Sequence, residues 1–356
     1  MIYDYIKNIP EEQLNRVIDN LLDLKDDLKK NIPRKTINQS LLLATWNIRD
    51  FDSNKFGHGH RLPESYLYIA EIISSFDLVA VQEINEDLTP LSRLIDILGK
   101  DSWDYIYTDM TEGISGNNER MCFIYDKRKV RFTKEAGQIV LTNSKLIQDS
   151  KQFARTPFKV SFQSGWFKFS LCTVHLYFGD ETGVKLDRRI EEIRTISKVL
   201  ASTAKREKSN IILLGDFNIV SPKHKTMTAL LKSGFKVPLE LRRETNMLKD
   251  KCYDQIAFML RKNELQFGSS KPNSGVYDPF SVVLKSEDFQ IYYDIVEDKT
   301  KWDELSKNHN TLESARKNYF EKTWRTFQIS DHLPLWVELN IDFSDEYLLN
   351  LTEKTN

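Results

Sequence analysis

IILLGDFNIV, residues 211–220, is the stretch that reveals most about this chain. Four aliphatic residues run into Gly215 and are followed by Asp216 and Asn218. An unbroken apolar run of this kind predicts a β-strand that is buried on both faces. A carboxylate at the end of such a strand is costly unless its charge is compensated. The stretch therefore predicts an interior strand whose end carries part of a functional site.

Short apolar runs of the same type recur outward from this stretch and alternate with amphipathic segments. The pattern predicts strands at 40–48, 77–84, 119–132, 158–178, 210–218, 252–260 and 332–341, and helices at 11–30, 61–76, 91–100 and 188–207. Several of these strands are apolar on both sides, so each sheet must be covered on both faces. We therefore expect an α/β protein in which two layers of sheet are covered by helices.

The N-terminal residues differ from this pattern. Residues 1–39 are predicted to form an amphipathic helical extension ahead of the main domain at 40–345. The apolar face of its helix is expected to dock on that domain, and binding of a protein partner is the alternative.

One internal stretch and the C-terminal end also stand apart. Residues 268–329 carry clusters of Gly, Ser, Asn and Asp and then a helical pattern near 303–324. We interpret them as an insertion before the last strand, because long ordered loops in compact domains tend to be functional. Residues 346–356 are interpreted as a C-terminal tail.

Polar side chains occur where the predicted strands end. They are Asn47, Glu83, His175, Asp216 and Asn218, with Asp331 and His332 just before the final strand. Carboxylates that meet at one rim of a sheet repel one another, and a bound divalent cation removes that repulsion. Hard cations such as Mg²⁺ prefer oxygen ligands, and the donors of this kind are the carboxylates of Glu83, Asp216 and Asp331 and the amide oxygens of Asn47 or Asn218.

Two histidines, His175 and His332, complete this set. Neutral imidazole accepts a proton near neutral pH, and imidazolium donates one. Each ring needs an acceptor on its second nitrogen, and Glu119 and Asp254 are the candidates. Taken singly, each residue is better explained as a turn, a cap or a core residue. The agreement of five segments in order and in strand context indicates metal-assisted hydrolysis, most plausibly of a phosphate ester.

The motifs TWNIRDF (45–51), VAVQEI (79–84), TVHLYFGD (173–180), LLGDFNIVSP (213–222), YDQIAF (253–258) and SDHLPLWVEL (330–339) carry a family resemblance. In this order they resemble the endonuclease/exonuclease/phosphatase superfamily. Arg49, GNNERMCFIYD (116–126) and QFARTPFKVSF (152–162) resemble its deoxyribonuclease I-like branch. The resemblance covers roughly residues 40–340 apart from the insertion. It implies a four-layer α/β sandwich of two packed, mainly antiparallel sheets flanked by helices.

The resemblance also implies roles for the site residues. Asn47 and Glu83 would hold one Mg²⁺, and Asp216, Asn218 and Asp331 would hold the same ion or a second one. Mn²⁺ is a substitute, and Ca²⁺ is a further candidate ion. His175, oriented by Glu119, and His332, oriented by Asp254, would flank the scissile phosphate, with either one as base or acid. Arg155, Arg49 and Asn218 would contact substrate phosphate.

The chain also departs from deoxyribonuclease I. Asn117 stands where that family has an aromatic residue for the minor groove, and Asn85 stands where it has an arginine. The family disulfide is missing. These changes put tight docking in a duplex minor groove in doubt, but not hydrolysis.

Composition limits the partners and the compartment. The 356 residues hold 51 Lys and Arg against 52 Asp and Glu, so nucleic-acid binding would rest on local patches. Candidate patches are Arg188/Arg189, Lys205–Lys208, Arg242/Arg243 and Lys127–Arg131, although a solvated helix or strand face explains most of them, and 188–198 in particular. The three separated cysteines and the lack of a leader or spanning segment predict a cytoplasmic protein without membrane contact.

The leading hypothesis is a metal-dependent phosphodiester hydrolase, a DNA endonuclease that nicks and leaves 5′-phosphate and 3′-hydroxyl ends. The first alternative keeps the chemistry and changes the substrate to RNA, a nucleotide or an inositol or lipid phosphate. The second is a non-catalytic binding module on the same fold.

Overall fold

The computed structural model describes residues 2–110, 117–147, 151–261, 266–297 and 311–353. Strands β1 (Ser40–Asn47) and β8 (Ile211–Asp216) are buried along their whole length. In β1, Leu41 and Leu43 face the space between two sheets, whereas Leu42 and Ala44 face covering helices. The unbroken apolar runs are therefore explained by burial on both faces.

One sheet has six strands in the order β10-β11-β1-β2-β4-β3. Besides β1, its strands are β2 (Leu78–Ile84), β3 (Trp103–Tyr107), β4 (Arg120–Asp126), β10 (Ser274–Val276) and β11 (Leu335–Asn340). Only β1 and β2 pair in parallel, with Asn47 opposite Gln82. This pairing brings the carboxyl ends of both strands, and hence Asn47 and Glu83, to one edge of the sheet.

The other sheet has five strands in the order β5-β6-β7-β8-β9. Besides β8, its strands are β5 (Arg131–Gln138), β6 (Phe158–Ser164), β7 (Phe167–His175) and β9 (Asp254–Met259). Here β7 and β8 are the parallel pair, with His175 directly opposite Asp216. Each sheet thus contains one parallel pair, and each pair ends in residues of the predicted site.

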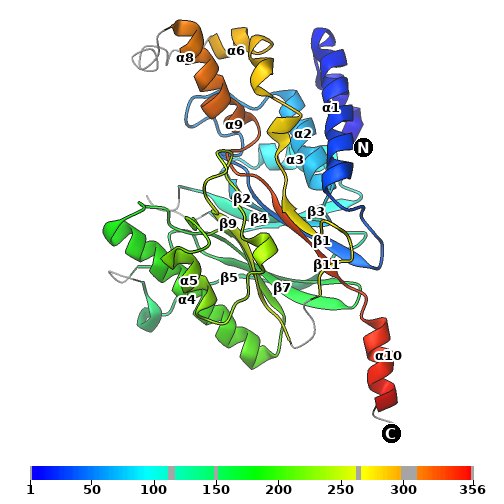
Figure 1. Ribbon diagram of the computed structural model, residues 1–356, viewed down its shortest axis with the longest axis vertical. Helices are drawn as coiled ribbons and strands as arrows, with labels where there is room; N and C mark the ends of the chain where they lie inside the picture. The colour runs from blue at the N-terminus through cyan, green and yellow to red at the C-terminus, as the bar shows by residue number, and fades with distance from the viewer. Residues whose placement is uncertain (1, 111–116, 148–150, 262–265, 298–310, 354–356) are drawn as a thin grey trace.

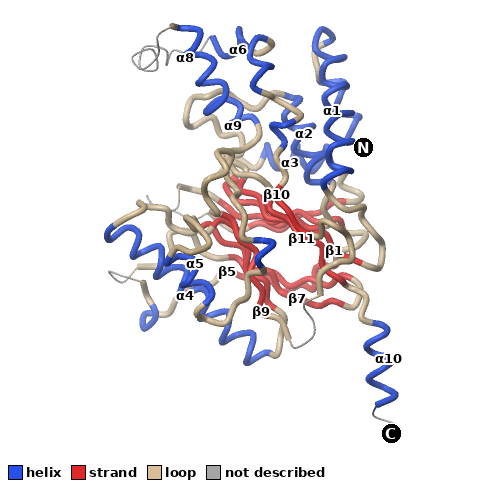
Figure 2. Tube along the Cα trace, in the orientation of Figure 1, coloured by secondary structure: helices blue, strands red, loops and turns tan. Residues whose placement is uncertain are grey.

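The sheets pack face to face, and helices cover their outer faces (Figures 1 and 2). The helices on the outer side of the six-stranded sheet are α1 (Glu11–Asn31), α2 (Pro63–Ser74), α3 (Thr89–Leu98), α6 (Tyr293–Glu297), α8 (Leu312–Tyr319) and α9 (Arg325–Gln328). The five-stranded sheet is covered by α4 (Gly183–Glu207) and α5 (Lys225–Leu231). The prediction of a four-layer α/β sandwich is confirmed.

Short helical segments occupy several connections: η1 (Ile2–Asn8), η2 (Asn143–Lys145), η4 (Leu239–Leu241), η5 (Pro279–Ser281), η6 (Ser286–Gln290) and the π-helical η8 (Phe320–Trp324). Cys122, Cys172 and Cys252 are buried and free. Within the described residues, no helix combines the length and the apolarity that crossing a membrane requires.

The predicted insertion contributes to the sheet as well as to the outer layer. Strand β10 pairs with β11 at the sheet edge and was missed because it has only three residues. Helix α8 and η8 lie within the helical pattern near 303–324, and α9 follows directly after it. The part of the pattern before residue 311 falls outside the described residues. Strand β3 was also missed, and α10 (Ser344–Glu353) gives the predicted tail a helix.

The N-terminal helix α1 is docked on the domain through its apolar face. Val17, Leu21 and Leu24 are buried in the cluster that α2 also joins. A polar contact fixes its position, because the Arg16 guanidinium lies 2.7 Å from Glu64 and donates a 2.6 Å hydrogen bond to the Tyr292 hydroxyl. A protein partner would therefore have to use the outward face of α1.

Gly215 allows β8 to lie close to β7. Its φ is +126°, and a Cβ added there would lie 2.2 Å from the Val174 carbonyl oxygen. Any side chain at this position would push apart the two strands that carry His175 and Asp216.

We predict that Gly215→Ala lowers the free energy of unfolding by about 2 kcal/mol or more, because strain and overlap add. Urea unfolding measures this change. The matched control is Gly137→Ala, since a Cβ at Gly137 meets no atom within 4 Å. The control should change stability by less than about 0.5 kcal/mol. Equal effects of the two substitutions would contradict this explanation.

Candidate active site

One carboxylate oxygen, Oδ2 of Asp216, is the point on which the predicted site residues converge. His175 Nε2 lies 3.6 Å from it and His332 Nε2 lies 3.8 Å from it. Asn47 Nδ2 donates a 3.2 Å hydrogen bond to the same oxygen. Burial raises the pKa of Asp216, but the two histidines and the hydrogen bonds from Asn218 and Asn47 together outweigh burial and lower the pKa.

His332 is hydrogen-bonded to Asp254, the residue that the family resemblance implies as its partner. Its Nδ1 lies 2.8 Å from Asp254 Oδ2 in a buried hydrogen bond. Burial alone would lower the pKa of His332, but Asp254 and Asp216 raise it well above its usual value. The ring therefore presents Nε2 to Asp216 while Nδ1 is occupied.

His175 faces Glu119 in the corresponding way. Its Nδ1 lies 3.0 Å from Glu119 Oε2, although the angle falls outside hydrogen-bond geometry. Arg155 donates two hydrogen bonds to the same carboxylate, from Nε at 2.6 Å and from Nη2 at 3.3 Å. Burial raises the pKa of Glu119, but His175 and Arg155 outweigh it and lower the pKa. Arg155 is thus committed to Glu119 in this structure.

Glu83 reaches the site because β2 is irregular at its end. The pairing of β2 with β4 shifts register between Val81 and Ile84, and Glu83 has a φ of +64°. A bulge of this kind re-aims a side chain, and strained backbone of this kind is often found at functional sites. The Glu83 carboxylate accepts hydrogen bonds from Asn47 Nδ2 at 2.9 Å and from the Asp50 N–H at 2.8 Å.

The oxygens at this point fit a hard cation. Asn47 Oδ1 is buried and has no hydrogen-bond partner, although the other side-chain atom of Asn47 bonds both Glu83 and Asp216. An orphaned amide oxygen beside two carboxylates is the donor set that Mg²⁺ prefers. The described residues contain no cluster of three or more His, Cys, Asp or Glu arranged for a metal. The fit therefore rests on Asn47 together with Glu83 and Asp216.

Asp331 and Arg49 lie beside this centre and pair with each other. The Asp331 side chain is 41% exposed, and its carboxylate lies 3.5 Å from the Arg49 guanidinium. Arg49 also donates to Thr326 at 2.6 Å and stacks over Phe327 at 4.0 Å. Residues of α9 from the insertion thus hold the arginine that the sequence predicted to contact phosphate.

Asn218 has a left-handed backbone, with a φ of +53°, and its N–H donates to Asp216 Oδ1 at 2.8 Å. Its side-chain Nδ2 donates to the Leu176 carbonyl at 2.9 Å. Asn218 therefore connects the end of β8 with the segment that follows His175.

Solved structures share this fold. A protein of the endonuclease/exonuclease/phosphatase family from Bacteroides thetaiotaomicron is 18% identical, with 86% of this chain and 99% of that chain covered and a TM-score of 0.51. A mannosyl-6-phosphatase from the same organism is also 18% identical, with 84% and 99% covered and a TM-score of 0.50. D. rerio TDP2 complexed with a single-strand DNA product is 13% identical, with 85% and 99% covered and a TM-score of 0.51.

This chain has the endonuclease/exonuclease/phosphatase fold. The resemblance found in the sequence motifs is confirmed at the level of the fold. No family model and no curated protein matches the chain.

Helix α4 supports the candidate site with two buried charges that the sequence analysis misread. The pattern at 188–198 predicted a solvated helix face, but Arg189 and Glu192 are completely buried. Glu192 accepts 3.0 Å hydrogen bonds from the N–H groups of Ala154 and Tyr177. It thereby holds the residue before Arg155 and the second residue after His175. An arginine and a glutamate three apart on an apolar helix face were the available signal.

Arg189 is a clamp rather than a phosphate contact. It donates to the carbonyls of Phe178, Asp180 and Asn218, the last at 2.8 Å. The interpretation of Arg188/Arg189 as a phosphate-binding pair is therefore wrong for Arg189, because its N–H groups already donate hydrogen bonds to backbone carbonyls. Several other basic residues are also engaged within the chain: Lys129 pairs with Asp77, Arg128 with Asp126, Arg206 with Glu207, and Arg242 donates to the Val237 carbonyl.

The positions where the chain departs from deoxyribonuclease I lie as follows. Asn85 is buried and donates to Asp50 at 3.1 Å, so it is not presented to a substrate. Asn117 is exposed, with a φ of +55°.

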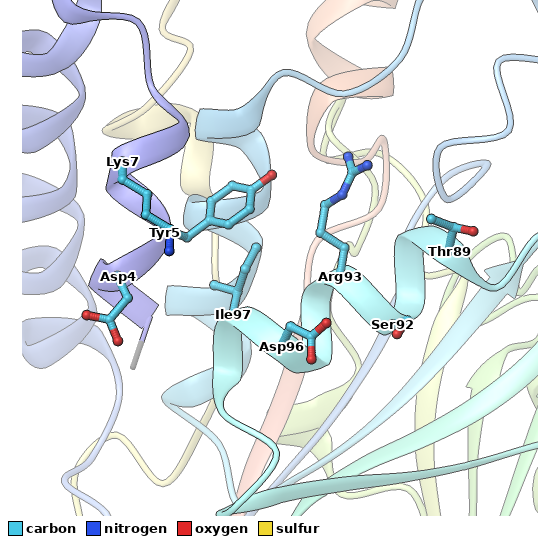
Figure 3. A pocket seen from close by; sticks show the side chains of 8 residues that line it. All are labelled: Asp4, Tyr5, Lys7, Thr89, Ser92, Arg93, Asp96 and Ile97. Carbon is cyan, nitrogen blue, oxygen red and sulfur yellow. The ribbon is translucent and has the colours of Figure 1, made fainter.

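A hollow of about 500 Å³ lies away from the candidate site, between η1 and α3 (Figure 3). None of the predicted site residues lines it.

We predict that Glu192→Gln lowers the free energy of unfolding by about 1–3 kcal/mol, because one of the two N–H groups loses its acceptor and the ion pair with Arg188 is lost. Urea unfolding measures the loss. Glu191→Gln is the matched control, because Glu191 is one residue away, partly exposed and paired with Arg194 at the helix surface. It should cost less than about 0.5 kcal/mol. A control as damaging as Glu192→Gln would refute the assignment.

Proposed function

We propose that this chain is a divalent-metal-dependent phosphodiester hydrolase that nicks DNA and leaves 5′-phosphate and 3′-hydroxyl ends. The observation that carries the proposal is the convergence of two histidine Nε2 atoms on one buried aspartate oxygen. Each ring has a carboxylate at its Nδ1, at 3.0 Å for His175 and 2.8 Å for His332. A structural role alone would not require two such oriented pairs at one point.

In an in-line displacement at phosphorus, the side chains of the site would have different roles. Asp254 and Glu119 keep the Nδ1 side of each ring occupied, so that Nε2 of His332 or His175 accepts or donates a proton at the reacting oxygens. Arg49 and Asn218 are proposed to contact the phosphate, together with Nη1 of Arg155, the guanidinium nitrogen that takes no part in the two hydrogen bonds to Glu119. Both histidines have the same relation to Asp216, and either fits the role of base or acid.

Asn47, Glu83 and Asp216 would hold the cation, and Asp331 and Asn218 are further candidate ligands. When bound, Mg²⁺ or Mn²⁺ supplies positive charge that stabilises the negative charge developing on the phosphate oxygens. Ca²⁺ is a further candidate ion for these oxygens.

DNA is the proposed substrate because a protein of the same fold, TDP2 of D. rerio, is described with a single-strand DNA product. A mannosyl-6-phosphatase also has this fold, so the fold alone does not select the ester. RNA, nucleotides and inositol or lipid phosphates are therefore the alternatives. A purely binding role is disfavoured because every predicted metal acid and both histidines are present.

We expect the wild-type protein to convert supercoiled plasmid to nicked circles in Mg²⁺ and to lose this activity in EDTA. Asp216→Asn should reduce nicking to background, and His332→Ala should reduce the rate by about 10²–10⁴-fold. The control is Asp187→Asn, because Asp187 is an exposed acid on α4. It should nick at the wild-type rate. Nicking by Asp216→Asn at the wild-type rate would refute the proposal.

Metal binding has its own test that does not depend on turnover. A cation that binds only the folded chain should stabilise it by about 2.7 kcal/mol at a free concentration of 100 Kd. We expect Mg²⁺ or Mn²⁺ to raise the melting temperature of the wild type but not of Glu83→Gln. Glu86→Gln, an exposed acid three residues away, should respond like the wild type. A full response of Glu83→Gln would exclude Glu83 as a ligand.

A further inference from the structure

Two exposed phenylalanines flank the candidate active site, one from each sheet layer. Phe56 lies in the connection from β1 to α2 and is 50% exposed. Phe178 lies in the connection from β7 to α4 and is 44% exposed. Scattered exposed apolar residues are normal, so their meaning depends on what holds them and on what lies beside them.

Phe178 is connected to His332 through one aromatic ring. Its ring meets that of Tyr253 edge to face at 6.3 Å, and Tyr253 stacks on the His332 ring at 5.6 Å. The guanidinium of Arg189 lies 4.8 Å from the Phe178 ring centroid while it clamps the Phe178 carbonyl. Phe178 is therefore supported from within although much of its ring is exposed.

Phe56 is connected to Asp331 in a similar way. Its ring lies 5.8 Å from that of Phe327, which carries Arg49 at 4.0 Å, and Arg49 lies 3.5 Å from Asp331. Lys55 Nζ lies 5.1 Å from the Phe56 ring and 3.5 Å from Asp50, whose N–H binds Glu83. Phe56 thus lies beside the metal-ligand side of the site, and Phe178 beside its histidine side.

We propose that Phe56 and Phe178 are stacking platforms for unpaired bases on the two sides of the scissile phosphate, so that the strand to be cut is unpaired there, as in a single strand or in an unwound segment of a supercoiled plasmid. This inference rests on the proposed function. Exposed aromatic rings that are held in place beside a nucleic-acid site are typical of single-strand binding, because a phenyl ring stacks on any base. In a duplex the base faces are already stacked on one another, and these rings would have nothing to receive.

The alternative to single-strand binding is docking in the minor groove of a duplex, and the chain lacks suitable side chains for it at two positions. Asn85 is buried against Asp50, and Asn117 has no aromatic ring. Phenylalanine donates no hydrogen bond, so recognition through Phe56 and Phe178 would be tolerant of sequence.

The test is binding of a fluorescent 12-nucleotide single strand, followed by anisotropy in EDTA so that no cleavage occurs. A blunt duplex of the same sequence is the comparison. Phe56→Ala and Phe178→Ala should each weaken single-strand binding by about 5- to 100-fold. Duplex binding should change by less than about twofold, and Phe178→Trp should restore single-strand binding. With cleavage allowed, the alanine variants should raise KM and leave kcat unchanged.

Trp166→Ala is the matched control, because Trp166 is 53% exposed and precedes β7, at the end opposite His175. It should bind the single strand like the wild type. The inference is overturned if the alanine variants bind the single strand normally, if they lose duplex binding equally, or if the wild type does not bind the single strand. If the wild type binds the strand and loses binding in these variants but cleaves no phosphodiester, the inference stands and the proposed function fails.

Discussion

A buried negative charge at Asp216 is the constraint around which the site is arranged. Its carboxylate lies at the end of a strand with no solvent beside it, and such a charge is stable only when positive or hydrogen-bonding groups compensate it. His175, His332 and Asn47 supply that compensation from three different strands or loops. Each of these three groups also contacts a second acid: His175 contacts Glu119, His332 contacts Asp254, and Asn47 contacts Glu83. A cation fits next to this arrangement because the Asn47 oxygen is left without a partner.

The backbone brings these groups together by two unusual pairings. In sheets that are otherwise antiparallel, β1–β2 and β7–β8 run in parallel, and their carboxyl ends therefore meet at one edge. Local strain completes the placement. Glu83 and Asn218 have left-handed backbones, and Gly215 leaves room for β7. These are departures from regular geometry that the surrounding core has to sustain.

The layers outside the sheets also contribute to the site. Helix α4 places Glu192 and Arg189 under three segments that carry Arg155, His175 and Asn218. Helix α9, from the insertion, holds Arg49 through Thr326 and Phe327. The outer helices are therefore part of the support of the site as well as a cover for the sheets.

The sequence by itself determined the fold class, the main strands and the set of polar residues at their ends, because burial on both faces and strand-end polarity are local patterns. It did not show β3 or β10, since short edge strands have weak patterns and are defined by their neighbours. Only the tertiary structure decided that Arg189 and Glu192 are buried, because helical spacing places them on one face but cannot say what covers it. The same holds for the convergence on Asp216 Oδ2, which joins residues up to 169 positions apart. Contacts of that range depend on how the two sheets pack.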